Sequence, residues 1–385
     1  MKKRLLAVGL ASVFAAGTAA AQNLTVYGLV DGGYLLNKGT DGTNTQSQGT
    51  VGGVQSANGS GTLSGSRLGF RATEDLGGGT RLTLVLENGV NFTSPVDQKT
   101  VAAATATPAT NGQQILSANT RAAYVDVAFA TSGSVRIGTQ DSIQKLITDS
   151  YDVGGCTSLT GACNFYQGIL PTTRPGDAVI YTAPELAPGL GVKLGYYLSG
   201  NASSQTIVSN GSTSAFSLEY KIGGLSAALA QEKTTNMYRA VTYAIFDSYY
   251  DINATNAAGL VKTTGQAINF AYDMGGGVKF TWINASNQDS NATTSASKVK
   301  LASNTAGAMY SVGPNTFRAN LTRGKVLRGD VSSDVKTSGY QLIATHDLSK
   351  RTNLYFAMGQ SYYDVRDNTT DAKLTQTAVG LRHSF

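Results

Sequence analysis

The sequence predicts an all-β protein, a transmembrane antiparallel β-barrel of about sixteen strands. Three observations lead to this fold class. Apolar and polar residues alternate with period two along the whole chain, and the connections between these segments fall into a short and a long class. After residue 21, no stretch has the roughly eighteen consecutive apolar residues of a membrane helix. A closed barrel is the other structure that satisfies its backbone hydrogen bonds in lipid.

The first 21 residues have the layout of a secretory signal peptide. A basic start at residues 2–4 precedes an apolar run at residues 5–16, and residues 19–21 form an A-x-A cleavage site. The apolar run is too short for an anchor helix. We therefore expect residues 22–385 to form one barrel domain, and removal of three basic residues lowers the formal net charge from +6 to +3. This small excess gives no reason to expect nucleic acid as a partner.

The alternation is clear in single segments, where one face is apolar and the other polar. Val278, Phe280 and Trp282 alternate with Lys279 and Thr281. Successive side chains of a strand point to opposite faces, so such a segment presents an apolar side to lipid and a polar side to an interior. A soluble β-sandwich alternates in the same way, and the connections must therefore distinguish the two folds.

The connections alternate in length along the chain. Seven short turns lie at residues 74–79, 130–133, 184–189, 222–224, 273–277, 313–315 and 347–350. Eight long polar connections lie at residues 37–62, 93–117, 141–176, 200–212, 235–264, 287–298, 327–335 and 363–373. A sandwich has no reason to sort its connections in this manner. An outer-membrane barrel does so, because its periplasmic turns are short and its extracellular loops are long.

Several stretches resemble the general diffusion porins of β-proteobacteria, within the Gram-negative porin family. The matching stretches are Leu24-Thr25-Val26-Tyr27-Gly28 with Asp31, Ser66-Arg67-Leu68-Gly69-Phe70-Arg71, Glu74-Asp75-Leu76-Gly77-Gly78-Gly79, Arg121 with Ala123-Tyr124-Val125, Val179 with Tyr181 and Pro184, and Val379-Gly380-Leu381-Arg382-His383-Ser384-Phe385. The resemblance implies a sixteen-stranded, homotrimeric barrel in the lipid of the outer membrane, with its third loop folded into the lumen. It also implies a water-filled channel for passive diffusion of small hydrophilic solutes and ions.

Alternation and the family pattern together predict a basic wall inside the channel. Its members are Arg67, Arg71, Arg81, Arg121, Arg136 and Arg174. The same alternation, with Tyr124 outward, turns Asp126 outward as well. Arginine keeps its charge at physiological pH, so such a wall would give a mild preference for anions. In the alternative interpretation, each arginine pairs with a nearby acid such as Asp31, Glu74 or Glu87.

The long connection at residues 141–176 is expected to supply the opposite wall of the constriction. Its acids are Asp141, Asp149 and Asp152. Cys156 and Cys163 lie in the same connection, and in an oxidising envelope this pair favours a disulfide. A metal-binding pair or two free thiols are the alternatives.

We expect no catalysis, cofactor or metal site. The two histidines, His346 and His383, lie outside any recognisable nucleophile motif. The glycine clusters at residues 77–79 and 275–277 do not precede helices, which excludes phosphate-binding loops. A substrate-specific channel and a barrel adhesin remain as rival functions. Single-channel recording would separate them, because the first shows saturable block by one solute class and the second does not conduct.

Overall fold

The computed structural model describes residues 23–40, 45–51, 62–90, 116–157, 159, 173–199, 211–242, 255–291, 298–328, 335–365 and 371–385. The expected signal peptide and Cys163 lie outside these residues. No helix within the described part of the chain is long and apolar enough to span a membrane.

The described residues form seventeen strands and one helix. In chain order these are β1 (Asn23–Thr40), β2 (Thr45–Val51), β3 (Arg67–Gly77), β4 (Thr80–Val90), β5 (Leu116–Phe129), β6 (Gly133–Thr139), α2 (Ile143–Tyr151), β7 (Asp177–Thr182), β8 (Leu190–Ser199), β9 (Gly211–Ile222), β10 (Leu225–Thr242), β11 (Thr255–Gly275), β12 (Val278–Asn291), β13 (Lys298–Val312), β14 (Asn315–Arg328), β15 (Val335–Asp347), β16 (Thr352–Val365) and β17 (Ala372–Ser384).

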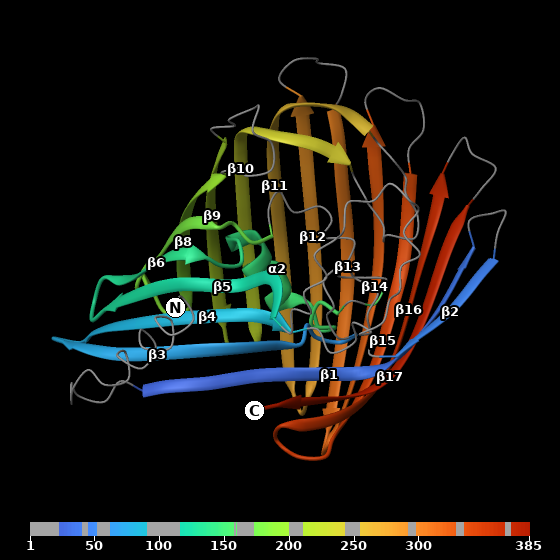
Figure 1. The fold of residues 1–385 in the computed structure, drawn as a ribbon, viewed down its shortest axis with the longest axis horizontal. Coiled ribbons are helices and arrows are strands. Elements are labelled where there is room, and N and C mark those ends of the chain that lie inside the picture. Colours follow the sequence, from blue (N-terminus) through green and yellow to red (C-terminus); the bar gives the residue numbers. More distant parts are fainter. Residues whose placement is uncertain are drawn as a thin grey trace, which may run out of the picture.

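Sixteen of these strands, β1 and β3 to β17, form a closed antiparallel barrel (Figure 1). The first strand closes the ring because its two halves pair on opposite sides. Residues 23–29 pair with β3, and residues 29–40 pair with β17. The short strand β2 folds back on residues 34–40 of β1. The expected number of barrel strands is confirmed, and β2 is an addition from within the first long connection.

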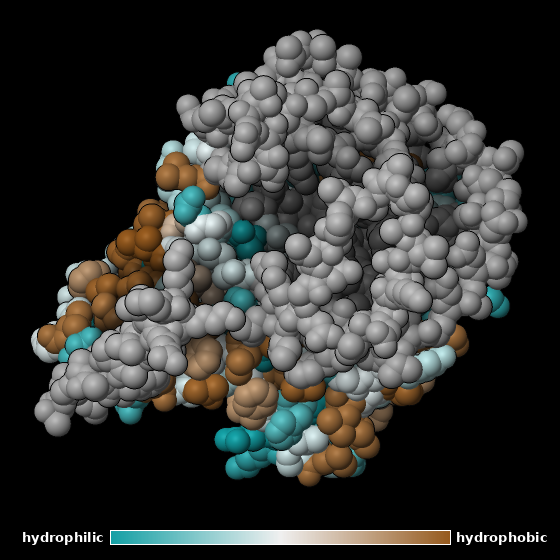
Figure 2. Space-filling model, in the orientation of Figure 1, coloured by the Kyte–Doolittle hydropathy of each residue, from teal (hydrophilic) through white to brown (hydrophobic). Residues whose placement is uncertain are grey.

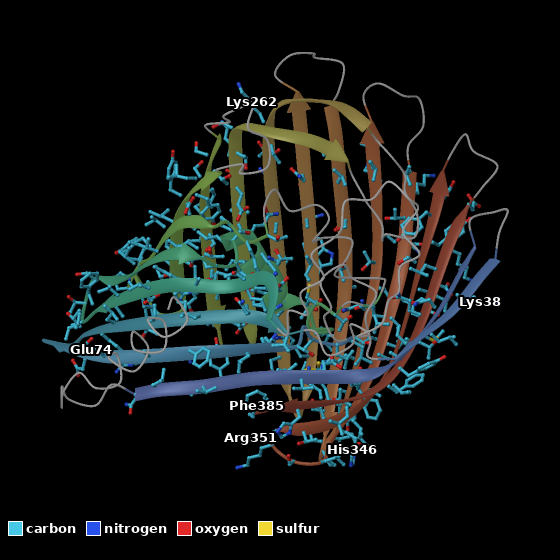
Figure 3. All side chains as sticks on the ribbon, viewed as in Figure 1. Lys38, Glu74, Lys262, His346, Arg351 and Phe385 are labelled. Carbon is cyan, nitrogen blue, oxygen red and sulfur yellow. The ribbon has the colours of Figure 1, made fainter. Side chains whose placement is uncertain are left out.

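The two ends of the barrel differ, as the lengths of the connections indicate. Glu74, His346, Arg351 and Phe385 lie at the end with the tight turns, while Lys38 and Lys262 lie toward the opposite end (Figure 3). The carboxyl terminus joins the turn end, where Phe385 and Gly28 exchange two backbone hydrogen bonds of 3.1 Å. A Cβ atom on Gly28 would lie 2.4 Å from the Phe385 ring, so only glycine allows this approach.

The outer face of the barrel is apolar. Trp282 and Phe280 are 37% and 48% exposed, whereas Thr281 between them is 7% exposed and faces inward. Hydrophobic side chains gather on the visible outer sides of the barrel, at the left and bottom of the space-filling view (Figure 2). The expected alternation is therefore confirmed, with large apolar side chains outside and small or polar ones inside.

Strand lengths vary around the ring. The strands β6 and β7 have 7 and 6 residues, whereas β10 and β11 have 18 and 21. The expected loop at residues 235–264 is too long, because β10 continues to Thr242 and β11 begins at Thr255. The apolar residues of those extensions stand in adjacent pairs, such as Met237-Tyr238 and Leu260-Val261, so they do not alternate with polar ones and only backbone pairing reveals the strands.

Candidate functional site

The helix α2 lies inside the barrel against the inner face of strands β8 to β12. Ile143, Ile147 and Tyr151 form one buried cluster with residues of β7 to β12, among them Tyr197 and Ile283. Most of the other wall residues in this cluster are alanines. Small side chains on the inner wall make room for a helix about 10 Å wide. The third long connection therefore folds into the interior, as the resemblance implied.

Wall residues hold the first turn of α2. The amide of Ile143 donates to the Tyr197 hydroxyl at 2.8 Å, and the amide of Gln144 donates to the Glu232 carboxylate at 2.9 Å. The amide of Lys145 donates to Ser142 Oγ at 3.3 Å. The first amides of a helix have no partner within it. Here two strands supply acceptors, and a carboxylate also suits the positive end of the helix dipole.

Beyond α2, the chain stays attached to the inner wall as far as β15. Asn320 of β14 donates to Asp152 at 2.7 Å, and Gln341 of β15 donates to the carbonyl of Leu159 at 2.8 Å. Leu159 is fully buried and packs in a small apolar cluster with Leu63 and Tyr355. The described residues of the third connection therefore line the interior from β7 to β16. Among the described elements, the inner wall of β3 to β6 lies outside this covering.

Five of the six predicted arginines lie on that wall. The guanidinium of Arg121 donates to Glu87 at 2.7 Å, and Arg67 lies 3.9 Å from the same carboxylate. Tyr27 also donates to Glu87, at 3.0 Å, and its ring lies 5.5 Å from the guanidinium carbon of Arg71. Within the described residues, Arg71 and Arg81 form no ion pair. The alternative of arginine–acid pairing thus applies to some members of the wall only.

A bulge at Arg121 changes the alternation of β5. Glu87 pairs with Ala122 and the next residue, Asn88, pairs with Thr120, so Arg121 is an extra residue on its strand. Such a bulge shifts which side chains face inward. The outward orientation expected for Asp126 is wrong, because Asp126 lies opposite Thr83 on the inner face.

Asp126 is part of an inner contact with Arg136. The guanidinium of Arg136 donates to Asp126 at 2.8 Å and lies 4.3 Å from the centre of the Tyr124 ring. Tyr124 therefore faces inward as well. A hollow of about 290 Å³ lies beside this contact, lined by Arg71, Thr73, Arg81, Thr83, Tyr124, Asp126 and Arg136.

The sixth arginine and the three acids meet around α2. Arg174 donates to Asp141 at 2.8 Å, and Lys145 lies between Asp141 and Asp149 and pairs with both. Asp152 is buried and accepts the amides of Gly154 and Cys156 at 2.8 and 2.9 Å. Burial raises the pKa of Asp149, and the ammonium of Lys145 opposes part of that rise. Cys156 is bonded in a disulfide.

The sequence matches the Gram-negative porin family over residues 7–368. This chain belongs to that family. An outer membrane porin protein of Bordetella pertussis is 28% identical to it over 427 aligned residues that cover both chains completely. The anion-selective porin from Comamonas acidovorans has the same fold, with a TM-score of 0.68, 18% identity and coverage of 95% and 100% of the two chains. The trimer form of in-vitro folded OmpT of Vibrio cholerae has a TM-score of 0.64 and is 14% identical, with coverage of 95% of this chain and 100% of that chain.

The porin fold defines the surroundings of each part of the site. As a Gram-negative outer membrane porin, the barrel lies in the bacterial outer membrane, and the tight turns of such barrels lie on the periplasmic side. The interior is a channel for passive diffusion, and membership of the family implies a channel rather than an enzyme. The third connection and the arginine wall of β3 to β6 form two sides of that channel.

The residues that attach the third connection to the porin wall were not predicted from the sequence. Glu232 is fully buried next to the inward-facing Ala230 of β10, and Tyr197 is fully buried on the inner face of β8. An acid at an inward position between small residues was the available signal. Lys145 was also missed, although it lies four residues from both Asp141 and Asp149, the spacing of helical ion pairs.

Proposed function

We propose that this porin passes small hydrophilic solutes with a mild preference for anions, set by the inner wall of β3 to β6. The charge balance of that wall supports the preference. Arg67, Arg71, Arg81, Arg121 and Arg136 face the channel from β3 to β6, against the three acids Asp75, Glu87 and Asp126. Their excess of two positive charges produces a field that attracts anions into a narrow aqueous passage.

The third connection supports a modest rather than a strong preference. Its acids Asp141, Asp149 and Asp152 exceed its partners Lys145 and Arg174 by one charge. A positive wall that faces a weakly negative one creates a transverse field in the constriction. Such a field orients dipolar solutes and attracts anions to one side. The anion-selective porin from Comamonas acidovorans, which shares the fold, is consistent with this selectivity.

Reversal potentials in planar bilayers test the proposal. Arg71→Gln with Arg81→Gln removes the two arginines that form no ion pair among the described residues, and we expect the potential under a salt gradient to shift toward cation preference. Lys325→Gln with Lys336→Gln removes the same charge from the outer face and should leave the potential unchanged. An unaltered potential in the arginine variant would refute the role of this wall.

We also propose that the mature chain begins at Gln22, that it assembles as a homotrimer and that Cys156 bonds to Cys163. The trimer form of the fold neighbour OmpT supports the assembly, and the bonded state of Cys156 supports the disulfide. A disulfide would stiffen the connection beyond α2. Native mass spectrometry of the detergent-solubilised protein tests the first residue and the trimer, and mass analysis of non-reduced peptides tests the disulfide.

A further inference from the structure

A basic groove lies on the outer face of the barrel, near the extracellular ends of β13 to β16. Two adjoining hollows of about 470 and 450 Å³ form it. Arg323, Lys325 and Lys336 line it, and all three are exposed. Short residues at neighbouring outward positions, such as Ala302 and Ser338, leave the space between the long side chains.

The three basic residues of this groove outnumber the one acid in its lining, Asp364. Lys325 lies directly opposite Lys336 in the pairing of β14 with β15, an arrangement that is unfavourable for like charges. Asp364 lies opposite Lys336 on the other side, yet none of these residues forms an ion pair within the described part of the chain. A bound anion would relieve the repulsion between the two lysines.

The groove also lies at the boundary between apolar and polar parts of the outer face. Along β14 the outward residues change from Phe317 and Leu321 to Arg323 and Lys325, and Leu321 is 64% exposed. Tyr340 and Tyr362 line the groove near this change, where aromatic side chains of membrane proteins gather. The basic residues are thus at the level of the lipid headgroups in the outer leaflet.

An apolar hollow of about 400 Å³ continues below the groove. It is lined mainly by Phe280, Tyr310, Phe317, Leu342 and Phe356, and it includes Ala319, two residues along β14 from Leu321 of the basic groove. Basic, mixed and apolar hollows therefore follow one another down the same strands. This order matches an amphiphile with an anionic head and acyl chains. A second protein surface would need an acidic and an apolar part in the same order.

We propose that this groove binds an outer-leaflet lipid with a phosphate-bearing headgroup, through Arg323, Lys325 and Lys336, with its acyl chains along the apolar hollow. Arginine and lysine both bind phosphate oxygens well. Basic residues near a membrane surface each strengthen the attraction to an anionic lipid by a factor of about five. The site lies outside the channel and is independent of the anion preference.

Native mass spectrometry of the detergent-solubilised porin, with diphosphorylated lipid A as the probe, tests the proposal. Lys325→Gln with Lys336→Gln should weaken retention of lipid A by about tenfold or more. The matched control is Lys38→Gln with Lys233→Gln, which removes the same charge from two other exposed lysines at outward positions, and it should bind as the natural protein does. Phosphatidylcholine with the same chains should be retained weakly by all three proteins. Single-channel conductance should be equal in the three, which separates this proposal from that on ion preference.

Three results would overturn the proposal. An equal loss of lipid A retention in both double variants would show that lipid A is attracted by the net charge of the protein and not by a specific site. Competition by inorganic phosphate at concentrations similar to those of lipid A would show a site for the free ion. Dissociation of an oligomer in the Lys325 and Lys336 variant, with unchanged binding of lipid A, would show an interface between copies of the chain.

Discussion

At the residue scale, the position of the constriction depends on a buried acid in the barrel wall. Glu232 on β10 accepts a hydrogen bond from the backbone amide of Gln144 in α2, and the two residues are 88 positions apart in the chain. The hydroxyl of Tyr197 on β8 accepts a hydrogen bond from the backbone amide of Ile143. These two contacts fix where α2 begins, and hence how far the third connection extends across the channel.

Replacing Glu232 by alanine should loosen α2. The buried amide of Gln144 would lose its acceptor, at a cost of about 1–3 kcal/mol. We expect single-channel recordings with larger fluctuations of conductance, because the helix would leave the wall intermittently. Glu232→Gln retains an acceptor oxygen and should behave almost as the natural protein. Steady conductance in the alanine variant would contradict the anchoring role.

Asp149 should make the selectivity depend on pH. Burial raises its pKa, so its carboxylate takes up a proton at a higher pH than an exposed aspartate does. Protonation removes one negative charge and leaves Lys145 less neutralised. The preference for anions should therefore increase as the pH falls below neutral, as reversal potentials would show. Asp149→Asn should have the increased preference already at neutral pH, with a weaker pH dependence.

At the scale of elements, the closing seam where the carboxyl terminus meets β1 leaves little space for larger residues. Gly28 lies against the ring of the terminal Phe385, while a Cβ on Gly32 of the same strand would meet nothing within 4 Å. Both residues belong to β1, which has to pair with β3 in one half and β17 in the other. The ring therefore closes with the Phe385 side chain packed against a position of β1 that has no side chain.

Gly28→Ala should destabilise the folded barrel by about 1–3 kcal/mol, because its Cβ would displace the Phe385 ring or the strand. Gly32→Ala is the matched control and should have little effect. Urea titration of refolded protein in detergent, followed by tryptophan fluorescence of Trp282, would compare the two. Equal stabilities would show that the seam adjusts without cost.

At the scale of the whole molecule, the proposed anion preference depends on a separation of charges between the two sides of the channel. Strands β3 to β6 present the arginine wall, and strands β8 to β12 support α2. The outer face carries a third charged region, the basic groove, at the lipid boundary. Because successive residues of a strand point to opposite faces, neighbouring residues contribute to the channel wall and to the outer face.

The selectivity should decrease with rising ionic strength. Screening acts over about 10 Å at 0.1 M salt and about 3 Å at 1 M. We expect the ratio of anion to cation permeability to approach one as salt increases, since the arginines act at a distance across water. In the Arg71→Gln, Arg81→Gln variant this ratio should vary much less with salt. A ratio that is independent of salt in the natural protein would indicate selection by direct binding.

The sequence by itself determined the fold class, the sorted connections and the faces of most strands, because alternation is a local property of the pleated backbone. Phe280 and Trp282 outside, with Thr281 inside, follow from their order alone. It also predicts that Arg67, Arg71 and Arg81 share the inner face of β3 and β4. Only the tertiary structure decided the orientation of Asp126, since the bulge at Arg121 depends on pairing with β4. The partners of Glu232 and Asp152 likewise arise from contacts between distant segments, and no local pattern encodes these.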